Sequence, residues 1–104
     1  MRFEGKNVIV TGANGGFGRA AALRFSSEGA NVACVDLSKD DLSDLRNEIL
    51  SSGGKAIAIA ADVTQNTQVE AYVSETVSEF GGIDVLFNNA GIEGFISPLE
   101  NYDE

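Results

Sequence analysis

Four short apolar runs, separated by helical patterns, constrain the fold of this 104-residue chain more than any other feature. The runs contain few polar residues, which is typical of strands buried on both faces of a parallel sheet. We expect strands at Val8–Val10, Val32–Val35, Ala56–Ala60 and Ile83–Phe87.

The gaps between these runs have the spacing of amphipathic helices. We expect helices from the glycine cluster at residues 12–18 to Gly29, from Ser38 to Gly53, and from near Thr64 to Gly81. Ser38 and Asp41 form a pair that resembles a capping box. The side chains expected on the buried helix faces are Phe17, Ala21, Phe25, Leu42, Leu45, Ile49, Val69, Val73, Val77 and Phe80. The alternation predicts right-handed βαβ units in one α/β domain spanning residues 1–104.

Composition excludes several classes of function. Sixteen acidic against seven basic residues give a net charge of −9, which disfavours nucleic acid and anionic membrane surfaces as partners. No apolar run approaches the ~20 residues of a bilayer span, and no signal-peptide core follows Met1. The absence of histidine removes the commonest metal ligand, and we expect no metal site. Cys34 is expected to be a buried core residue in a cytoplasmic protein, and Tyr72 to be a packing residue of the third helix.

Ligands of parallel sheets bind beyond the carboxyl ends of the strands. The segments that follow the four strands are small or polar: Thr11–Gly18, Asp36–Leu37, Asp62–Val63 and Asn88–Gly91. We therefore expect a binding site where these segments meet.

The first of these segments lies within V-T-G-A-N-G-G-F-G, which contains Gly12, Gly15, Gly16 and Gly18. At a strand-to-helix junction, such glycines let a pyrophosphate approach free backbone N–H groups. The spacing is neither G-x-G-x-x-G nor a P-loop. The alternative is a glycine-rich turn with a packing role only.

Asp36 ends the second strand, where a carboxylate can accept hydrogen bonds from both ribose hydroxyls and repel a 2′-phosphate. No Lys or Arg occupies the positions where a positive charge could support NADP, namely Ala13, Asn14, Gly15 and Leu37. This pattern favours NAD over NADP, although Asp36 could also be an ordinary strand-end acid.

The two later segments have both binding and structural interpretations. Asp62 could bind an adenine amino group while Val63 packs on the ring, or Asp62 could simply precede a helix. Asn88 and Asn89 could satisfy strand-end backbone groups, and Ala90-Gly91 leaves room for a flat ligand.

With these four motifs, the chain resembles the short-chain dehydrogenase/reductase family over essentially all 104 residues. The loop matches T-G-x-x-x-G-x-G at Thr11, Gly12, Gly16 and Gly18. It also satisfies T-G-x-x-G-x-x-G of the extended branch that contains sugar epimerases, because Gly15 is present. Asp62-Val63 and Asn88-Asn89-Ala90-Gly91 are similar to the non-extended branch, and the epimerase-type interpretation remains the minor alternative.

The resemblance implies a Rossmann-type doubly wound parallel sheet, truncated after about four strands and three helices. It implies hydride transfer between NAD and a secondary alcohol or ketone, and a homo-oligomer in the full-length form. The cofactor-binding residues that it implies are Gly12, Asn14, Gly15, Gly16, Phe17, Gly18, Asp36, Leu37, Asp62, Val63, Asn88, Ala90 and Gly91.

The chain departs from the family pattern in its catalytic residues. The family's catalytic serine and Tyr-x-x-x-Lys lie beyond the N-N-A-G motif, whereas Tyr72 is followed four places later by Thr76, and no lysine follows Tyr102. We expect no catalytic residue within this chain, which would be the inactive cofactor-binding half of an oxidoreductase. The alternative from another class is a stand-alone, non-catalytic nucleotide-binding or interaction module. We also expect the far edge of the fourth strand and an apolar surface to be exposed, which would favour self-association.

Overall fold

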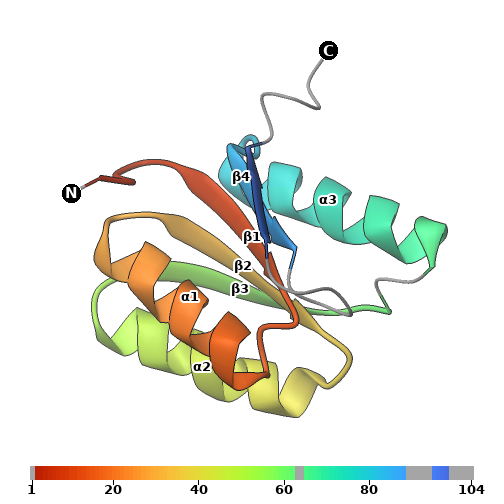
Figure 1. The fold of residues 1–104 in the computed structure, drawn as a ribbon, viewed down its shortest axis with the longest axis horizontal. Coiled ribbons are helices and arrows are strands. Elements are labelled where there is room, and N and C mark those ends of the chain that lie inside the picture. Colours follow the sequence, from red (N-terminus) through yellow and green to blue (C-terminus); the bar gives the residue numbers. More distant parts are fainter. Residues whose placement is uncertain (1, 63–64, 89–94, 99–104) are drawn as a thin grey trace.

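Five strands form one sheet in the computed structural model, which describes residues 2–62, 65–88 and 95–98 (Figure 1). The strands are β1 (Asn7–Thr11), β2 (Asn31–Asp36), β3 (Lys55–Ala60), β4 (Val85–Asn88) and β5 (Phe95–Pro98). Their spatial order is β3-β2-β1-β4-β5, and the first four strands along the chain are parallel. The predicted Rossmann-type doubly wound parallel sheet is therefore confirmed.

The far edge of β4 differs from our expectation. We expected this edge to be exposed, but β5 pairs with it antiparallel, with Val85 opposite Pro98 and Asn88 opposite Phe95. Only six residues separate β4 from β5, fewer than the dozen or so that a crossover between parallel strands requires, so β5 runs antiparallel. The backbone groups of β4 thus have partners on both sides, and self-association through this edge loses its basis.

Three helices cover the sheet: α1 (Gly16–Ser27), α2 (Lys39–Ser51) and α3 (Asn66–Phe80). Figure 1 shows α1 and α2 on one face and α3 on the other. Ser38 is the N-cap of α2 as predicted, but its side chain makes no capping hydrogen bond. The predicted start near Thr64 lies outside the described residues, and Gln65 is the N-cap of α3. Among the described residues, no helix combines the length and apolar character of a membrane span.

The hydrophobic core consists of two layers, one on each face of the sheet, because alternate strand residues point in opposite directions. Val10 and Cys34 pack under α1 and α2, whereas Ile9 and Val35 pack on the α3 side with Tyr72. Cys34 is fully buried, and burial raises the pKa of its thiol to about 12. Burial also raises the pKa of Tyr72. The predictions that Cys34 and Tyr72 are packing residues are confirmed.

Two expected core positions prove to be exposed. Phe17 is 64% exposed and Val77 is 42% exposed. On α3, Tyr72 and Thr76 are the buried pair, and the Thr76 hydroxyl donates to the Tyr72 carbonyl at 2.7 Å. The buried face of α3 is therefore offset by about one residue from the predicted row of Val69, Val73 and Val77. Thr76 can be buried because its hydroxyl forms a hydrogen bond within the helix.

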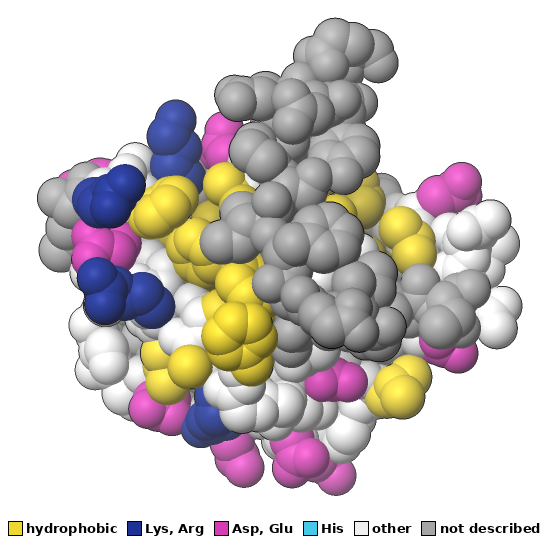
Figure 2. Space-filling view, viewed as in Figure 1, with side chains coloured by type: hydrophobic (Ala, Val, Ile, Leu, Met, Phe, Trp, Pro, Cys, Tyr) yellow, Lys and Arg dark blue, Asp and Glu magenta, His cyan; other side chains and the backbone are white. Residues whose placement is uncertain are grey.

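An apolar groove of about 300 Å³ lies beside α1. Phe3, Phe25 and Phe87 line it together with Ala21, and Arg2, Arg24 and Glu28 also contribute. Edge-to-face contacts join Phe25 to Phe3 at 5.0 Å and to Phe87 at 6.1 Å between ring centroids. Figure 2 shows hydrophobic side chains gathered in the middle of the face that carries α1, beside Lys and Arg side chains. The chain thus has the apolar surface that the sequence led us to expect.

At the amino end of the sheet, a polar cluster joins β1 to its neighbours. The Asn7 N–H donates to the Asp84 carboxylate at 2.8 Å, and the Asp84 N–H donates to the Asn7 carbonyl at 2.8 Å. The Asn7 side chain donates to the Phe80 carbonyl and accepts from the Asn31 amide. This cluster fixes the start of β4 against β1 and so helps to set the strand register.

Candidate functional site

The parallel register brings the predicted binding segments to one edge of the sheet. Thr11 is opposite both Val35 of β2 and Asn88 of β4, and Asp36 is opposite Ala60 of β3. The Thr11 hydroxyl donates to the Asn88 side-chain oxygen at 3.0 Å. The loop after β1 and the ends of β2, β3 and β4 therefore share the carboxyl edge where parallel sheets bind ligands.

The loop after β1 turns sharply and is bound to β2. Gly12 has a φ of 65°, a conformation that is easily reached only by glycine. The next residue, Ala13, is fully buried, and its N–H donates to the Val35 carbonyl at 3.1 Å. The loop is thus held by backbone bonds, which leaves its later residues to face outward.

The remaining glycines of the loop have different structural reasons. A Cβ on Gly18 would collide with the carbonyl oxygen of Gly12, so Gly18 permits close packing of α1 against the loop. A Cβ on Gly16 would meet nothing within 4 Å. Gly16 therefore presents bare backbone on an open side, where a ligand can approach closely.

The N-terminus of α1 has the properties of an anion site. Gly15 is its N-cap and supplies no side-chain hydrogen bond, and the first turn contains no acidic residue. The N–H groups of a first helical turn have no intrahelical acceptor, and the helix dipole places positive potential there. This end of α1 is consequently suited to a phosphate or pyrophosphate.

Asp36 and Asn14 form the second part of the site. The backbone N–H of Asn14 donates to one Asp36 carboxylate oxygen at 2.8 Å, and the N–H of Leu37 donates to the other at 2.7 Å. The Asn14 side-chain amide donates to the Ser38 carbonyl at 3.1 Å. The Asn14 side-chain oxygen is buried and has no hydrogen-bond partner among the described residues.

An unsatisfied buried acceptor is costly, and so a ligand hydroxyl is the natural donor to the Asn14 oxygen. The Asp36 carboxylate oxygens also have further lone pairs beyond their two amide bonds. The pair is therefore suited to recognising a group with neighbouring hydroxyls, such as a ribose.

Two apolar side chains at this edge are exposed. Leu37 is 71% exposed, and the Phe17 ring meets Phe87 edge to face at 5.8 Å between centroids.

Asp62 lies at the entrance to α3, where its N–H donates to the Gln68 side chain at 2.6 Å and its carbonyl accepts from Gln65.

Most of the predicted site residues thus lie at one edge of the sheet. Val63, Ala90 and Gly91 lie outside the described residues. The sequence placed Ser38 only at the start of a helix and did not indicate Gln68. The Ser38 carbonyl accepts a hydrogen bond from the Asn14 side chain, and the Gln68 side chain accepts one from the Asp62 N–H, and no motif marks either contact. Sequence reasoning also missed the salt bridge between Arg19 and Glu48, which joins the first turn of α1 to the C-terminal half of α2.

A cavity of about 540 Å³ lies away from these residues, between the C-terminal ends of α1 and α2. Its lining includes Ser26, Glu48, Gly54 and Lys55 but none of the predicted binding residues. The candidate site is therefore identified by the polar groups at the carboxyl edge of the sheet and not by the size of a cavity.

Comparison with known proteins gives a consistent result. A family model for short chain dehydrogenase matches residues 6–104. The chain is 43% identical over 103 residues to levodione reductase from Leifsonia aquatica, covering 97% of this chain. It is 42% identical over 100 residues to meso-2,3-butanediol dehydrogenase from Serratia marcescens, covering 96% of this chain. The chain spans only 39% of the length of each of these curated relatives.

Solved structures agree with this match. A metagenomic short-chain oxidoreductase in complex with NADP superposes with a TM-score of 0.82 at 33% identity, covering 88% of this chain and 42% of that one. A short chain dehydrogenase from Mycobacterium smegmatis gives a TM-score of 0.82 at 39% identity, covering 86% of this chain and 38% of that one.

Proposed function

This chain belongs to the short-chain dehydrogenase family, and from that premise we propose that it is the NAD-binding portion of an oxidoreductase. The relevant reaction is hydride transfer between NAD and a secondary alcohol or ketone. When bound, the nicotinamide cofactor supplies the hydride acceptor or donor, and the residues of this chain bind and orient its adenosine end.

The observation that carries the proposal is the pairing of Asp36 with the Asn14 backbone at 2.8 Å. It places a carboxylate beside the glycine loop, where it can accept hydrogen bonds from ribose hydroxyls. A 2′-phosphate at that position would meet like charge. One similar structure contains NADP, so the choice of NAD rests on Asp36 and requires its own test.

Three further features support a dinucleotide at this edge. Gly16 is bare and open, α1 has no side-chain cap, and the buried Asn14 oxygen needs a donor. The first two suit a pyrophosphate, and the third suits a ribose hydroxyl. Leu37 and Phe17, together with Asp62 and Asn88, complete the proposed cofactor surface. Val63, Ala90 and Gly91 belong to the same proposal from the sequence alone.

The substrate class is proposed from the relatives. One of them is named for meso-2,3-butanediol, a diol whose hydroxyls are secondary. A cytoplasmic location and homo-oligomerisation of a full-length form remain predictions.

The sequence of this chain contains no Tyr-x-x-x-Lys. We therefore expect that the chain alone binds cofactor but does not oxidise alcohols. Incubation with NAD and a panel of secondary alcohols, followed at 340 nm, tests this expectation. Steady NADH production would contradict it.

Calorimetric titration of the chain with NADH and NADPH tests the cofactor. We expect NADH to bind at least about tenfold more tightly, since one like-charge contact or lost charged hydrogen bond is worth that much. Asp36→Ala should remove most of this preference. Equal or tighter NADPH binding by the unmodified chain would refute the NAD assignment.

A further inference from the structure

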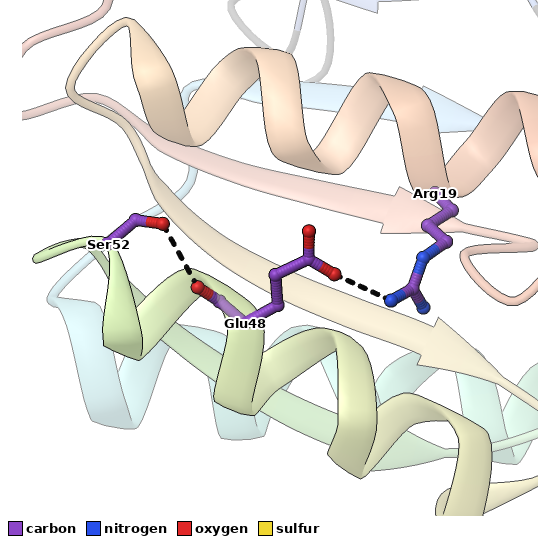
Figure 3. Close-up of polar contacts among 3 residues, drawn as sticks. All are labelled: Arg19, Glu48 and Ser52. Carbon is purple, nitrogen blue, oxygen red and sulfur yellow. Dashed lines mark hydrogen bonds and ion pairs between the residues drawn. The ribbon is translucent and has the colours of Figure 1, made fainter.

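Arg19 and Glu48 form a salt bridge between α1 and α2, the two helices that cover one face of the sheet (Figure 3). The distance from Arg19 Nη2 to Glu48 Oε1 is 2.7 Å. Arg19 lies in the first turn of α1, directly after the glycine loop, and its backbone N–H donates to the Gly15 carbonyl at 2.8 Å. Glu48 lies on α2, where its carbonyl accepts from the Ser52 hydroxyl at 3.2 Å.

The guanidinium of Arg19 lies on the same face of the sheet as the Asp36 carboxylate. Its positive charge acts on the Cys34 thiol, where it opposes the effect of burial on the pKa. Cys34 and Asp36 are two residues apart in β2, so their side chains project from one face about 7 Å apart. The Arg19 backbone is bound to the loop whose Asn14 N–H donates to Asp36, so another rotamer of the long Arg19 side chain would point towards the end of β2.

The salt bridge is open to competition. The side chains of Arg19 and Glu48 are 37% and 49% exposed, and exposed ion pairs are weak. A phosphate dianion is a stronger partner for a guanidinium than a single carboxylate is, because it offers more charge and more acceptor oxygens. Glu48 is therefore the group that a 2′-phosphate would have to displace in order to recruit Arg19.

We propose that Glu48 is a specificity-determining residue of the cofactor site, because it holds Arg19 between α1 and α2 and withholds it from a 2′-phosphate. This inference rests on the proposed cofactor function. In it, Asp36 repels the 2′-phosphate directly, and Glu48 removes the cation that could offset this repulsion. The effect is on NADPH alone, since NADH has no group at the 2′ position other than a hydroxyl.

The test compares Kd values for NADH and NADPH, measured by calorimetry, in the unmodified chain and in Glu48→Gln. We expect Glu48→Gln to lower the Kd for NADPH by about five- to tenfold, the size of one new charged hydrogen bond in a partly exposed site. The Kd for NADH should change less than about twofold, and 0.5 M NaCl should remove most of the gain.

Asp44→Asn is the matched control. Asp44 is an exposed acid on the same helix, and the described residues show no salt bridge to it. Asp44→Asn changes the net charge by the same amount as Glu48→Gln. It therefore measures how much the loss of one negative charge on α2 tightens NADPH binding regardless of its position. A gain for Asp44→Asn equal to that for Glu48→Gln would overturn the proposal.

The double variant Glu48→Gln/Arg19→Gln identifies which cation binds the 2′-phosphate of NADPH once Glu48 is neutral. Lys39, at the first turn of α2, is the rival candidate. Loss of the NADPH gain in the double variant supports Arg19, and persistence of the gain overturns the proposal. Weaker NADPH binding by Arg19→Gln alone would show that Arg19 already binds the phosphate, which also overturns it.

The outcomes separate this inference from the proposed function. If the unmodified chain binds NADH but NADPH binding does not respond to Glu48→Gln, only the role of Glu48 fails. If a folded chain, verified by circular dichroism, binds neither cofactor, the proposed function fails and the role of Glu48 fails with it.

Discussion

The Asp36 carboxylate accepts the backbone N–H of Asn14 over 2.8 Å, which joins the end of β2 to the loop that leaves β1. The residue proposed to select the cofactor thus also supports the loop proposed to hold its phosphates. Substitution of Asp36 therefore has two separable consequences, one for loop order and one for ligand preference.

Replacing Asp36 by alanine should loosen the loop, because the Asn14 N–H loses its acceptor. We expect the amide hydrogen exchange of Asn14, followed by NMR, to speed up by about tenfold, whereas Asp36→Asn keeps one acceptor oxygen and should exchange more slowly than Asp36→Ala. Equal exchange in the unmodified chain and in Asp36→Ala would show that the bond does not order the loop.

The stability of the fold should respond differently to alanine at Gly18 and at Gly16. Gly18→Ala places a methyl group against the Gly12 carbonyl, and we expect the free energy of unfolding to fall by about 1–3 kcal/mol. Gly16→Ala meets open space and should leave stability within about 1 kcal/mol, or raise it slightly, because alanine favours helix. Urea denaturation measures both effects.

The same Gly16→Ala variant should weaken NADH binding, since its methyl group would occupy the side proposed for the pyrophosphate. A variant with unchanged stability and unchanged NADH affinity would remove Gly16 from the proposed cofactor surface.

Asp84→Ala should destabilise the protein by about 1–3 kcal/mol, because the N–H of Asn7 would lose its carboxylate partner. Asn7 is 9% exposed, so water cannot fully replace that partner. Asp44→Ala, at an exposed position on α2, is the control and should stay within about 0.5 kcal/mol. Similar losses for both variants would indicate that the polar cluster at the amino end adds no specific stability.

Alkaline pH should destabilise the fold through Cys34. Its thiol pKa rises from 9.0 to about 12 on folding, because burial disfavours the thiolate. The contribution is fully present below pH 9 and is lost as the pH rises towards 12, since only the unfolded chain releases the proton in this range. Stability should fall with a slope approaching about 1.4 kcal/mol per pH unit above pH 9.

The Cys34→Ala variant isolates this effect, because it should show a shallower slope between pH 9 and 10.5 while being less stable at pH 7. Tyr72 contributes in the same direction at higher pH, and it does so in both proteins. Parallel slopes would contradict a buried thiol that ionises only on unfolding.

Much of the fold follows from local sequence patterns. Uninterrupted apolar runs indicate strands buried on both faces, and the glycines of residues 12–18 mark a strand-to-helix junction. These patterns predicted the four parallel strands, the three helices and the edge where Asp36 and Asn88 lie, because strand burial and helix periodicity are expressed within a few residues.

The remaining features depend on contacts between distant segments. Asn14 meets Asp36 across 22 positions, and Arg19 meets Glu48 across 29. Contacts between distant segments also decide the antiparallel direction of β5, the burial of Thr76 on α3 and the exposure of Phe17. The sequence by itself determined the order of the elements and the chemistry at the ends of the strands. Only the tertiary structure decided which of these groups meet, because side-chain partners depend on helix rotation and strand register, which are set by packing over the whole domain.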